Sequence, residues 1–176
     1  MTTPDRTQLL RHTVATLAYR AEKVLRAFPL DVVETRVSPG TRTPLELLSH
    51  LGDLMRWAEG LARGENRWQA VPAPSWAEAS ERFYRGLSAL DSAIAAASPD
   101  EARVQQVFQG PIADALTHVG QLAMLRGMLG CPVRPESYAR AEIRVGVVGR
   151  DQAAALKEFD GDASFPPREG GRAASR

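Results

Sequence analysis

The chain has 176 residues, of which 44% are hydrophobic and 24% charged, and its formal net charge is +1. A chain of this length can bury one substantial core, and the composition is ordinary for a soluble globular protein. Lysine and arginine form no strongly basic block, which argues against nucleic acid as the main partner. The single cysteine, Cys131, excludes an internal disulfide and favours a reducing, cytoplasmic location. No signal peptide and no apolar run of ~18 residues is found, so we expect no membrane partner.

A first helix is expected from about Pro4 to Phe28. Its expected inner side consists of Leu9, Leu10, Leu17, Val24 and Leu25. The prolines and the glycine of "FPLDVVETRVSPGTR" then predict a long connection.

The second helix has a clear start in "TPLE". Thr43 can cap the helix, Pro44 suits its first turn and Glu46 completes a capping box. The helix is expected to run to about Arg63. Its apolar face is predicted to consist of Leu47, Leu48, Leu51, Leu54, Met55, Ala58 and Leu61.

Two further capping signals follow. "SWAE" places Ser75 and Glu78 at the start of a third helix that continues through "FYRGLSALDSAIAAA". "SPDE" places Ser98 and Glu101 at the start of a short helical turn, which is expected to stop at Gly110.

The last long helix is expected to begin at Pro111 and to end at Gly130. It is apolar nearly all round, which is typical of a buried helix. A narrow polar stripe interrupts this pattern. With Asp114 at zero, His118 falls at about 40°, Gln121 at about 340° and Thr117 at about 300° around the helix axis.

Four long helices with short links predict an all-α fold, an up-and-down four-helix bundle with an irregular C-terminal extension. We expect one domain over residues 1–158, with the long helices within 4–130 and the extension over 131–158. Within the extension, "DQAAALKEF" is expected to form a short helix. Residues 159–176 have the composition of a flexible tail.

The stripe and the second helix together predict a metal site. Asp114 and His118 are four residues apart and therefore share a helix face. His50 lies at one border of the second helix's apolar face, so the three side chains can meet inside a bundle. Such a set can hold a divalent metal ion such as Zn, Ni, Fe or Mn. On spacing alone, an Asp and a His four residues apart more often form a simple hydrogen-bonded pair than a metal site.

Two segments resemble the DinB/YfiT-like superfamily. "TPLELLSHLGDLMRWA" resembles its second helix, and "DALTHVGQLAMLRGMLG" resembles its fourth, which usually carries two histidines four residues apart. His118 matches the second of those histidines, and Asp114 stands where the first is usual. The resemblance covers about residues 1–130. The later segment "PESYARAEIRVGVVGRDQ" is similar to one in a subset of the superfamily.

The resemblance implies a four-helix bundle, often dimeric, that holds a divalent metal with three histidines. Some relatives transfer low-molecular-weight thiols such as bacillithiol or mycothiol to electrophiles, or use mycothiol in isomerisation. Others are described as metal-dependent hydrolases. Asp114 in place of histidine changes the charge of the site by one unit and favours a harder metal ion.

The leading hypothesis is therefore a metal-dependent S-transferase, expected to be a homodimer that acts on a small-molecule substrate. Gln121 is a candidate to orient a ligand, and Trp57 and Arg126 are candidates to contact a thiol co-substrate, although Trp57 is more simply a core residue. A hydrolase is the second hypothesis, with Asp53 and Glu142 as candidate bases. The third hypothesis is a non-catalytic helical dimer with a polar core network or a small-ligand pocket.

Overall fold

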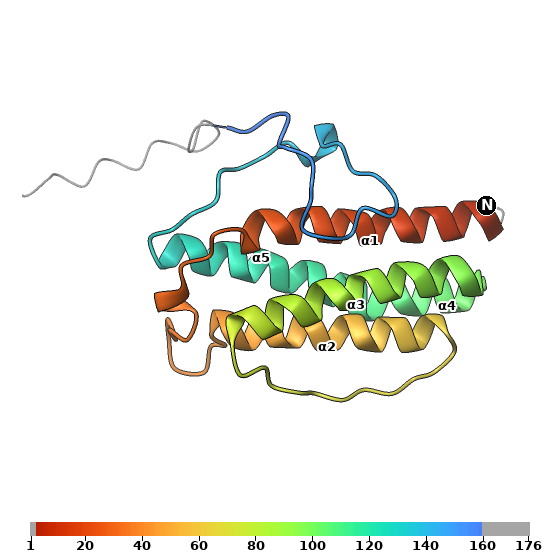
Figure 1. The fold of residues 1–176 in the computed structure, drawn as a ribbon, viewed down its shortest axis with the longest axis horizontal. Coiled ribbons are helices and arrows are strands. Elements are labelled where there is room, and N and C mark those ends of the chain that lie inside the picture. Colours follow the sequence, from red (N-terminus) through yellow and green to blue (C-terminus); the bar gives the residue numbers. More distant parts are fainter. Residues whose placement is uncertain (1–2, 160–176) are drawn as a thin grey trace, which may run out of the picture. The chain divides into compact units, whose positions relative to one another are not determined.

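The structure is a computed structural model that describes residues 3–159, and its regular elements are helices (Figure 1). The long elements are α1 (Thr3–Leu25), α2 (Pro44–Ala62), α3 (Trp76–Ala97) and α5 (Ala113–Met128). The shorter ones are α4 (Glu101–Val107), the π-helical η2 (Phe108–Ile112), and the 3₁₀ turns η1 (Leu30–Val32) and η3 (Tyr138–Arg140). Over residues 3–159 no β-strand occurs, and one isolated bridge joins Glu136 to Glu158. The predicted all-α class is confirmed.

The capping box at the start of α2 is confirmed in full. The Thr43 hydroxyl accepts a hydrogen bond from the Glu46 amide at 3.1 Å, and the Glu46 carboxylate accepts one from the Thr43 amide at 2.7 Å. The amide of Leu45 also donates to the carbonyl of Val33 at 2.8 Å. These bonds satisfy backbone groups that a helix start leaves open, and so fix where α2 begins.

The starts of α3 and α4 agree with the sequence only in part. Ser75 caps α3 by accepting a hydrogen bond from the Glu78 amide at 3.2 Å, as predicted. The prediction for Ser98 is wrong, because this residue ends α3 in the left-handed conformation at φ 44°. Asp100 caps α4 instead, since its carboxylate accepts from the Arg103 amide at 2.9 Å.

α2 and α3 run in the same direction. Arg82 donates to the carbonyl of Ser49, and four residues further along α3, Gly86 lies against Met55 of α2. The strict up-and-down alternation that we predicted is therefore wrong for this pair. The reason is the connection over residues 63–75, which at ~40 Å fully extended can return along the ~28 Å length of α2.

α1 and α5 run opposite to that pair (Figure 1). Arg11 forms a two-bond ion pair with Asp91, at 2.9 and 2.8 Å, and the hydroxyl of Tyr84 donates to the buried carboxylate of Glu22. Residue numbers thus rise along α1 as they fall along α3. The four long helices are compatible with a bundle in which directions change between α1 and α2 and again between α3 and α5.

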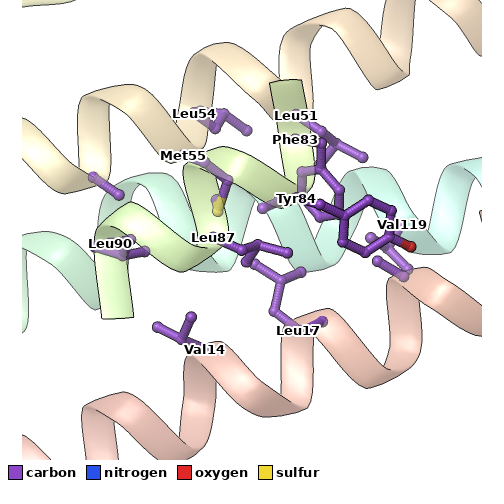
Figure 2. Close-up of a cluster of buried hydrophobic side chains, with 14 of the residues drawn as sticks. Val14, Leu17, Leu51, Leu54, Met55, Phe83, Tyr84, Leu87, Leu90 and Val119 are labelled. Atoms are coloured by element: carbon purple, nitrogen blue, oxygen red, sulfur yellow. The ribbon is translucent and has the colours of Figure 1, made fainter. Parts of the chain in front are cut away.

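The core lies between these helices, and Figure 2 shows part of it around Phe83, Leu87 and Leu17. Every residue of the predicted apolar face of α2 is buried. Leu9 on α1 is a wrong prediction, because it is exposed while the neighbouring Leu10 is buried. None of the helices in the described part of the chain is long and apolar enough to cross a membrane.

The expected break at Gly110 does not occur, because α4, η2 and α5 form one continuous helical run over residues 101–128. Pro111 lies inside this run, and its missing amide hydrogen is tolerated in the widened π-helical turn. Gly110 lies against Trp57, so that an added Cβ atom would come within 3.3 Å of the ring. The run is therefore a helix with a local change of pitch that shifts the faces of α5 relative to α4.

The chain divides into two compact units, which are described separately. The first contains residues 3–133 together with Ile143–Ala153. In it, Val148 is buried, and the guanidinium of Arg150 lies 4.4 Å from the centre of the Tyr84 ring and donates to Ser80 at 2.9 Å. Part of the predicted irregular extension thus contacts α3.

The second unit contains Arg134–Glu142 and residues 154–159. The amide of Ser137 donates to the carbonyl oxygen of Lys157, and the amide of Phe159 donates to the carbonyl oxygen of Pro135. Both hydrogen bonds are 3.0 Å long. The helix predicted for "DQAAALKEF" is therefore wrong, because the end of this segment pairs with residues 135–137 in an extended conformation. The tail predicted for 159–176 lies outside the described residues from 160 onwards.

The close contact of α2 with α3 gives a stability prediction. An alanine Cβ atom at position 86 would lie 2.7 Å from the Cβ atom of Met55, which no side-chain rotation can relieve. We expect Gly86→Ala to lower the free energy of unfolding by about 1–2 kcal/mol in urea denaturation. Gly120→Ala is the control, because that site in α5 has no neighbour within 4 Å. It should raise stability by up to about 1 kcal/mol. Equal effects of the two substitutions would contradict the close approach.

Candidate metal centre

His50, Asp114 and His118 converge on one point between α2 and α5. One potential ligand atom from each side chain lies within 4.8 Å of the others. Nε2 of His50 is 3.4 Å from Oδ2 of Asp114, and Nε2 of His118 is 3.3 Å from Oδ1 of the same carboxylate. The two rings meet nearly edge to face, at 81° and 4.8 Å between centres. The predicted convergence is confirmed, and the cluster could hold a metal ion.

The local sequence explains why these side chains meet. The capping box fixes the start of α2, and His50 lies at the edge of its buried face. α5 buries Ala115, Val119 and Leu122, which places Asp114 and His118 on an adjoining face. The side chains of His50 and His118 are 18% and 12% exposed, whereas that of Asp114 is 46% exposed. The cluster thus has a buried imidazole side and an open carboxylate side.

Gln121 contacts the ring of His118. Its side-chain oxygen lies 2.7 Å from Nδ1 of His118, and in this amide orientation it accepts the hydrogen of the tautomer protonated on Nδ1. In a neutral ring the lone pair is then on Nε2, which faces the Asp114 carboxylate. In this tautomer a positive charge, either a second ring proton or a metal ion, stabilises the 3.3 Å contact, whereas with the amide turned Nε2 donates its own hydrogen to the carboxylate.

The environment of His50 favours its neutral form. Burial lowers the pKa of His50 below its ordinary value, and the positive charges of Arg42 and His118 lower it further. The ring of Trp68 lies edge-on to His50 at 5.5 Å between centres. A neutral imidazole is the form that binds metal ions, so fewer protons compete for this ligand.

A cavity of about 610 Å³ opens beside the cluster. Its lining comprises Val37, Ser38, Thr41, Arg42, Leu47, His50, Asp114, His118, Gln121, Met124, Leu125 and Met128. Met124 and Met128 are 59% and 61% exposed, so the expectation that this helix is buried on all sides is wrong. The reason is that the apolar residues on this part of α5 line a cavity instead of contacting another helix.

Two of the predicted co-substrate residues lie elsewhere. Trp57 contacts Gly110 and Trp68 and donates from its indole nitrogen to Asn66 at 2.9 Å, and it does not line the cavity. Arg126 is buried, and it donates to the backbone carbonyls of residues 24, 26 and 131 at 2.8–2.9 Å. Its guanidinium connects the end of α5 to the end of α1, which is a structural role.

Of the two candidate bases, Asp53 is not brought to the cluster. The buried carboxylate of Asp53 accepts a hydrogen bond from the Val71 amide at 3.0 Å and lies 3.6 Å from Arg56 and from Arg82. It fixes the connection between α2 and α3. Glu142 belongs to the second compact unit, so its prediction as a base stays untested.

Sequence reasoning missed two residues that surround the cluster. Arg42 lines the cavity, and Trp68 contacts His50. Both lie in connections, where helical periodicity gives no information. A tryptophan within the polar stretch "RGENRWQA" was the one available signal for Trp68.

Comparisons of the chain with protein-family models, with curated proteins and with solved structures give no match. The functional argument therefore depends on the geometry of the cluster and its cavity.

The Gln121–His118 contact predicts an effect on metal affinity. Gln121→Leu removes the acceptor that holds Nδ1 and should lower zinc affinity by about 10–100-fold, measured by competition with a chromophoric chelator. Gln121→Glu retains an acceptor oxygen and should stay close to the unsubstituted protein. Equal zinc affinity in the leucine and glutamate variants, with unchanged helical content, would contradict this orienting role.

Proposed function

We propose that this protein is a divalent-metal-dependent enzyme that transfers a low-molecular-weight thiol to an electrophilic small molecule. The single observation that carries the proposal is the convergence of His50, Asp114 and His118 at the wall of a cavity large enough for a small molecule. We further infer that the helices form a four-helix bundle related to the DinB/YfiT-like superfamily, and that the protein is a homodimer.

The donor set supports metal binding. Two imidazoles and one carboxylate are the ligands of many sites that keep positions open for substrate. With the hydrogen of His118 on Nδ1, its Nε2 lone pair faces the carboxylate oxygen of Asp114, an arrangement that a cation stabilises. The carboxylate favours a harder ion such as Mn more than three imidazoles would, whereas Ni and Zn are the more nitrogen-preferring candidates.

The cavity favours thiol transfer over hydrolysis. A bound divalent ion would lower the pKa of a coordinated thiol, which is about 8.5 in free cysteine, and so make it nucleophilic near neutral pH. A hydrolase needs in addition a general base near the attacked bond. Asp114 is the one carboxylate among the described residues that line the cavity, and it belongs to the cluster itself.

The chain's own residues would then have distinct tasks. His50 and His118 would hold the ion with their Nε2 atoms, and Asp114 would offset part of its charge. Gln121 would orient His118 through its side-chain oxygen, and its amide nitrogen would be available to donate to a ligand in the cavity. The apolar lining of the cavity would exclude water from the reacting sulfur.

The first test is the metal content of untagged protein purified without chelator. We expect about one divalent ion per chain, and His118→Ala should lose it while retaining helical content and cooperative unfolding. His12→Ala is the matched control, because His12 is exposed on α1 and lies outside the cluster. Stoichiometric metal in the His118→Ala variant would show that the ligand assignment is wrong.

The second test is activity. The metal-loaded protein should accelerate conjugation of a thiol with a chlorinated nitroarene, and a chelator should abolish this until metal is returned. Bacillithiol, mycothiol, glutathione and coenzyme A should be compared, because the cavity has to recognise the rest of the thiol molecule. Hydrolysis of an ester without any thiol would favour the hydrolase. Inactivity with every substrate, in protein shown to hold metal, would favour a non-catalytic ligand-binding role.

A further inference from the structure

We propose that the cavity selects small molecules that carry an anionic group, held by Arg42, on an apolar body that packs against Met124 and Met128. This inference rests on the proposed function, because it names the class of substrate that would meet the metal cluster. It follows from two features of the cavity, an unpaired guanidinium and an apolar lining with two exposed methionines, and a divalent ion at the cluster would add to the positive charge.

Arg42 is held at the cavity by its neighbours in the chain. It directly precedes Thr43, whose reciprocal hydrogen bonds with Glu46 fix the start of α2. Arg36 donates to the carbonyl of Thr41 and forms an ion pair with Glu46 at 2.7 Å. The backbone on both sides of Arg42 is therefore anchored, whereas its side chain is exposed and free to contact a ligand.

The guanidinium of Arg42 has no hydrogen-bond or ion-pair partner in the part of the chain that the structure describes. This differs from nearby arginines, because Arg36 pairs with Glu46, and Arg56 and Arg82 lie beside Asp53. A guanidinium presents a planar set of donors that matches a carboxylate or phosphate. Its positive charge also acts on His50, which places it near the cluster.

Much of the remaining cavity lining is apolar and adaptable. Met124 and Met128 are one helical turn apart on α5, and Leu47, Leu125 and Val37 complete the apolar lining. Methionine side chains are flexible and polarizable, so they accommodate apolar groups of different shapes. The cavity volume of about 610 Å³ lies within the range of small-molecule sites.

With a divalent ion at the cluster, the charge of the cavity would favour anions. Among the described lining residues, Arg42 is the one permanent cation and Asp114 the one acid. These two charges cancel, so a divalent ion at the cluster would leave the cavity positive. Cationic ligands should therefore be excluded, and a neutral ligand of the same shape should lose the contact with Arg42.

The experiment uses hexanoate, hexanamide and hexylammonium as probes of equal chain length. Binding to the full-length protein is measured by calorimetry with and without a chelator, and methionine methyl NMR signals locate the ligand. We expect hexanoate to bind at least about 10-fold more tightly than hexanamide or hexylammonium and to shift the Met124 and Met128 signals. Arg42→Gln should weaken hexanoate about 10-fold and leave hexanamide unchanged. Arg63→Gln, which removes an arginine paired with Glu59, is the matched control and should have no effect.

Two results would overturn the inference. The first is equal hexanoate affinity in the Arg42→Gln and unsubstituted proteins, together with loss of binding when a chelator is added. In that case the metal ion, and not Arg42, would hold the hexanoate. The second is hexanoate binding that leaves both methionine signals in place. Metal content is measured in the same samples and reports separately on the proposed function. Protein without metal whose hexanoate binding still depends on Arg42 would contradict the metal enzyme and support the anion site.

Discussion

The Asp114 carboxylate lies between two imidazole nitrogens, and the functional interpretation depends on this contact. When His118 carries its hydrogen on Nδ1, beside the Gln121 oxygen, the opposite nitrogen presents a lone pair to a carboxylate oxygen 3.3 Å away. A positive charge at the two acceptors stabilises this form of the contact. A protonated His118 would supply one, and a divalent ion would supply one that also serves chemistry. Nε2 of His50 lies 3.4 Å from the same carboxylate. The lowered pKa of His50 favours its neutral form, which is the form that binds a metal ion.

Three local features fix the helices around this contact. The capping box of Thr43 and Glu46 sets the start of α2, and the close approach of Gly86 to Met55 holds α3 along it. The π-helical turn before α5 accommodates Pro111 without ending the helix, so the stripe from Asp114 to Gln121 continues on one face. The site is thus built on helical elements and needs no mobile loop to form it.

Much of this arrangement could be predicted from residue spacing. The α2 start and its buried face follow from caps and helical periodicity, which are local signals. The meeting of His50 with Asp114 and His118 required in addition the expectation that their helices are neighbours in a bundle. The parallel course of α2 and α3 was not predicted, because a connection as long as residues 63–75 permits either direction of the following helix. Arg42 and Trp68 were missed because they lie in connections, where helical periodicity gives no information. The pairing near Lys157 replaced an expected helix, since contacts between residues 135–137 and 157–159 are not visible in local propensity.

The most direct test of the central claim is an anomalous-diffraction experiment on crystals of the untagged protein grown with zinc. The account predicts one strong zinc peak about 2.0–2.2 Å from Nε2 of His50, Nε2 of His118 and a carboxylate oxygen of Asp114. Nδ1 of His118 should remain bonded to Gln121. A zinc peak elsewhere, or none at the cluster with the two histidines still paired to Asp114, would contradict it.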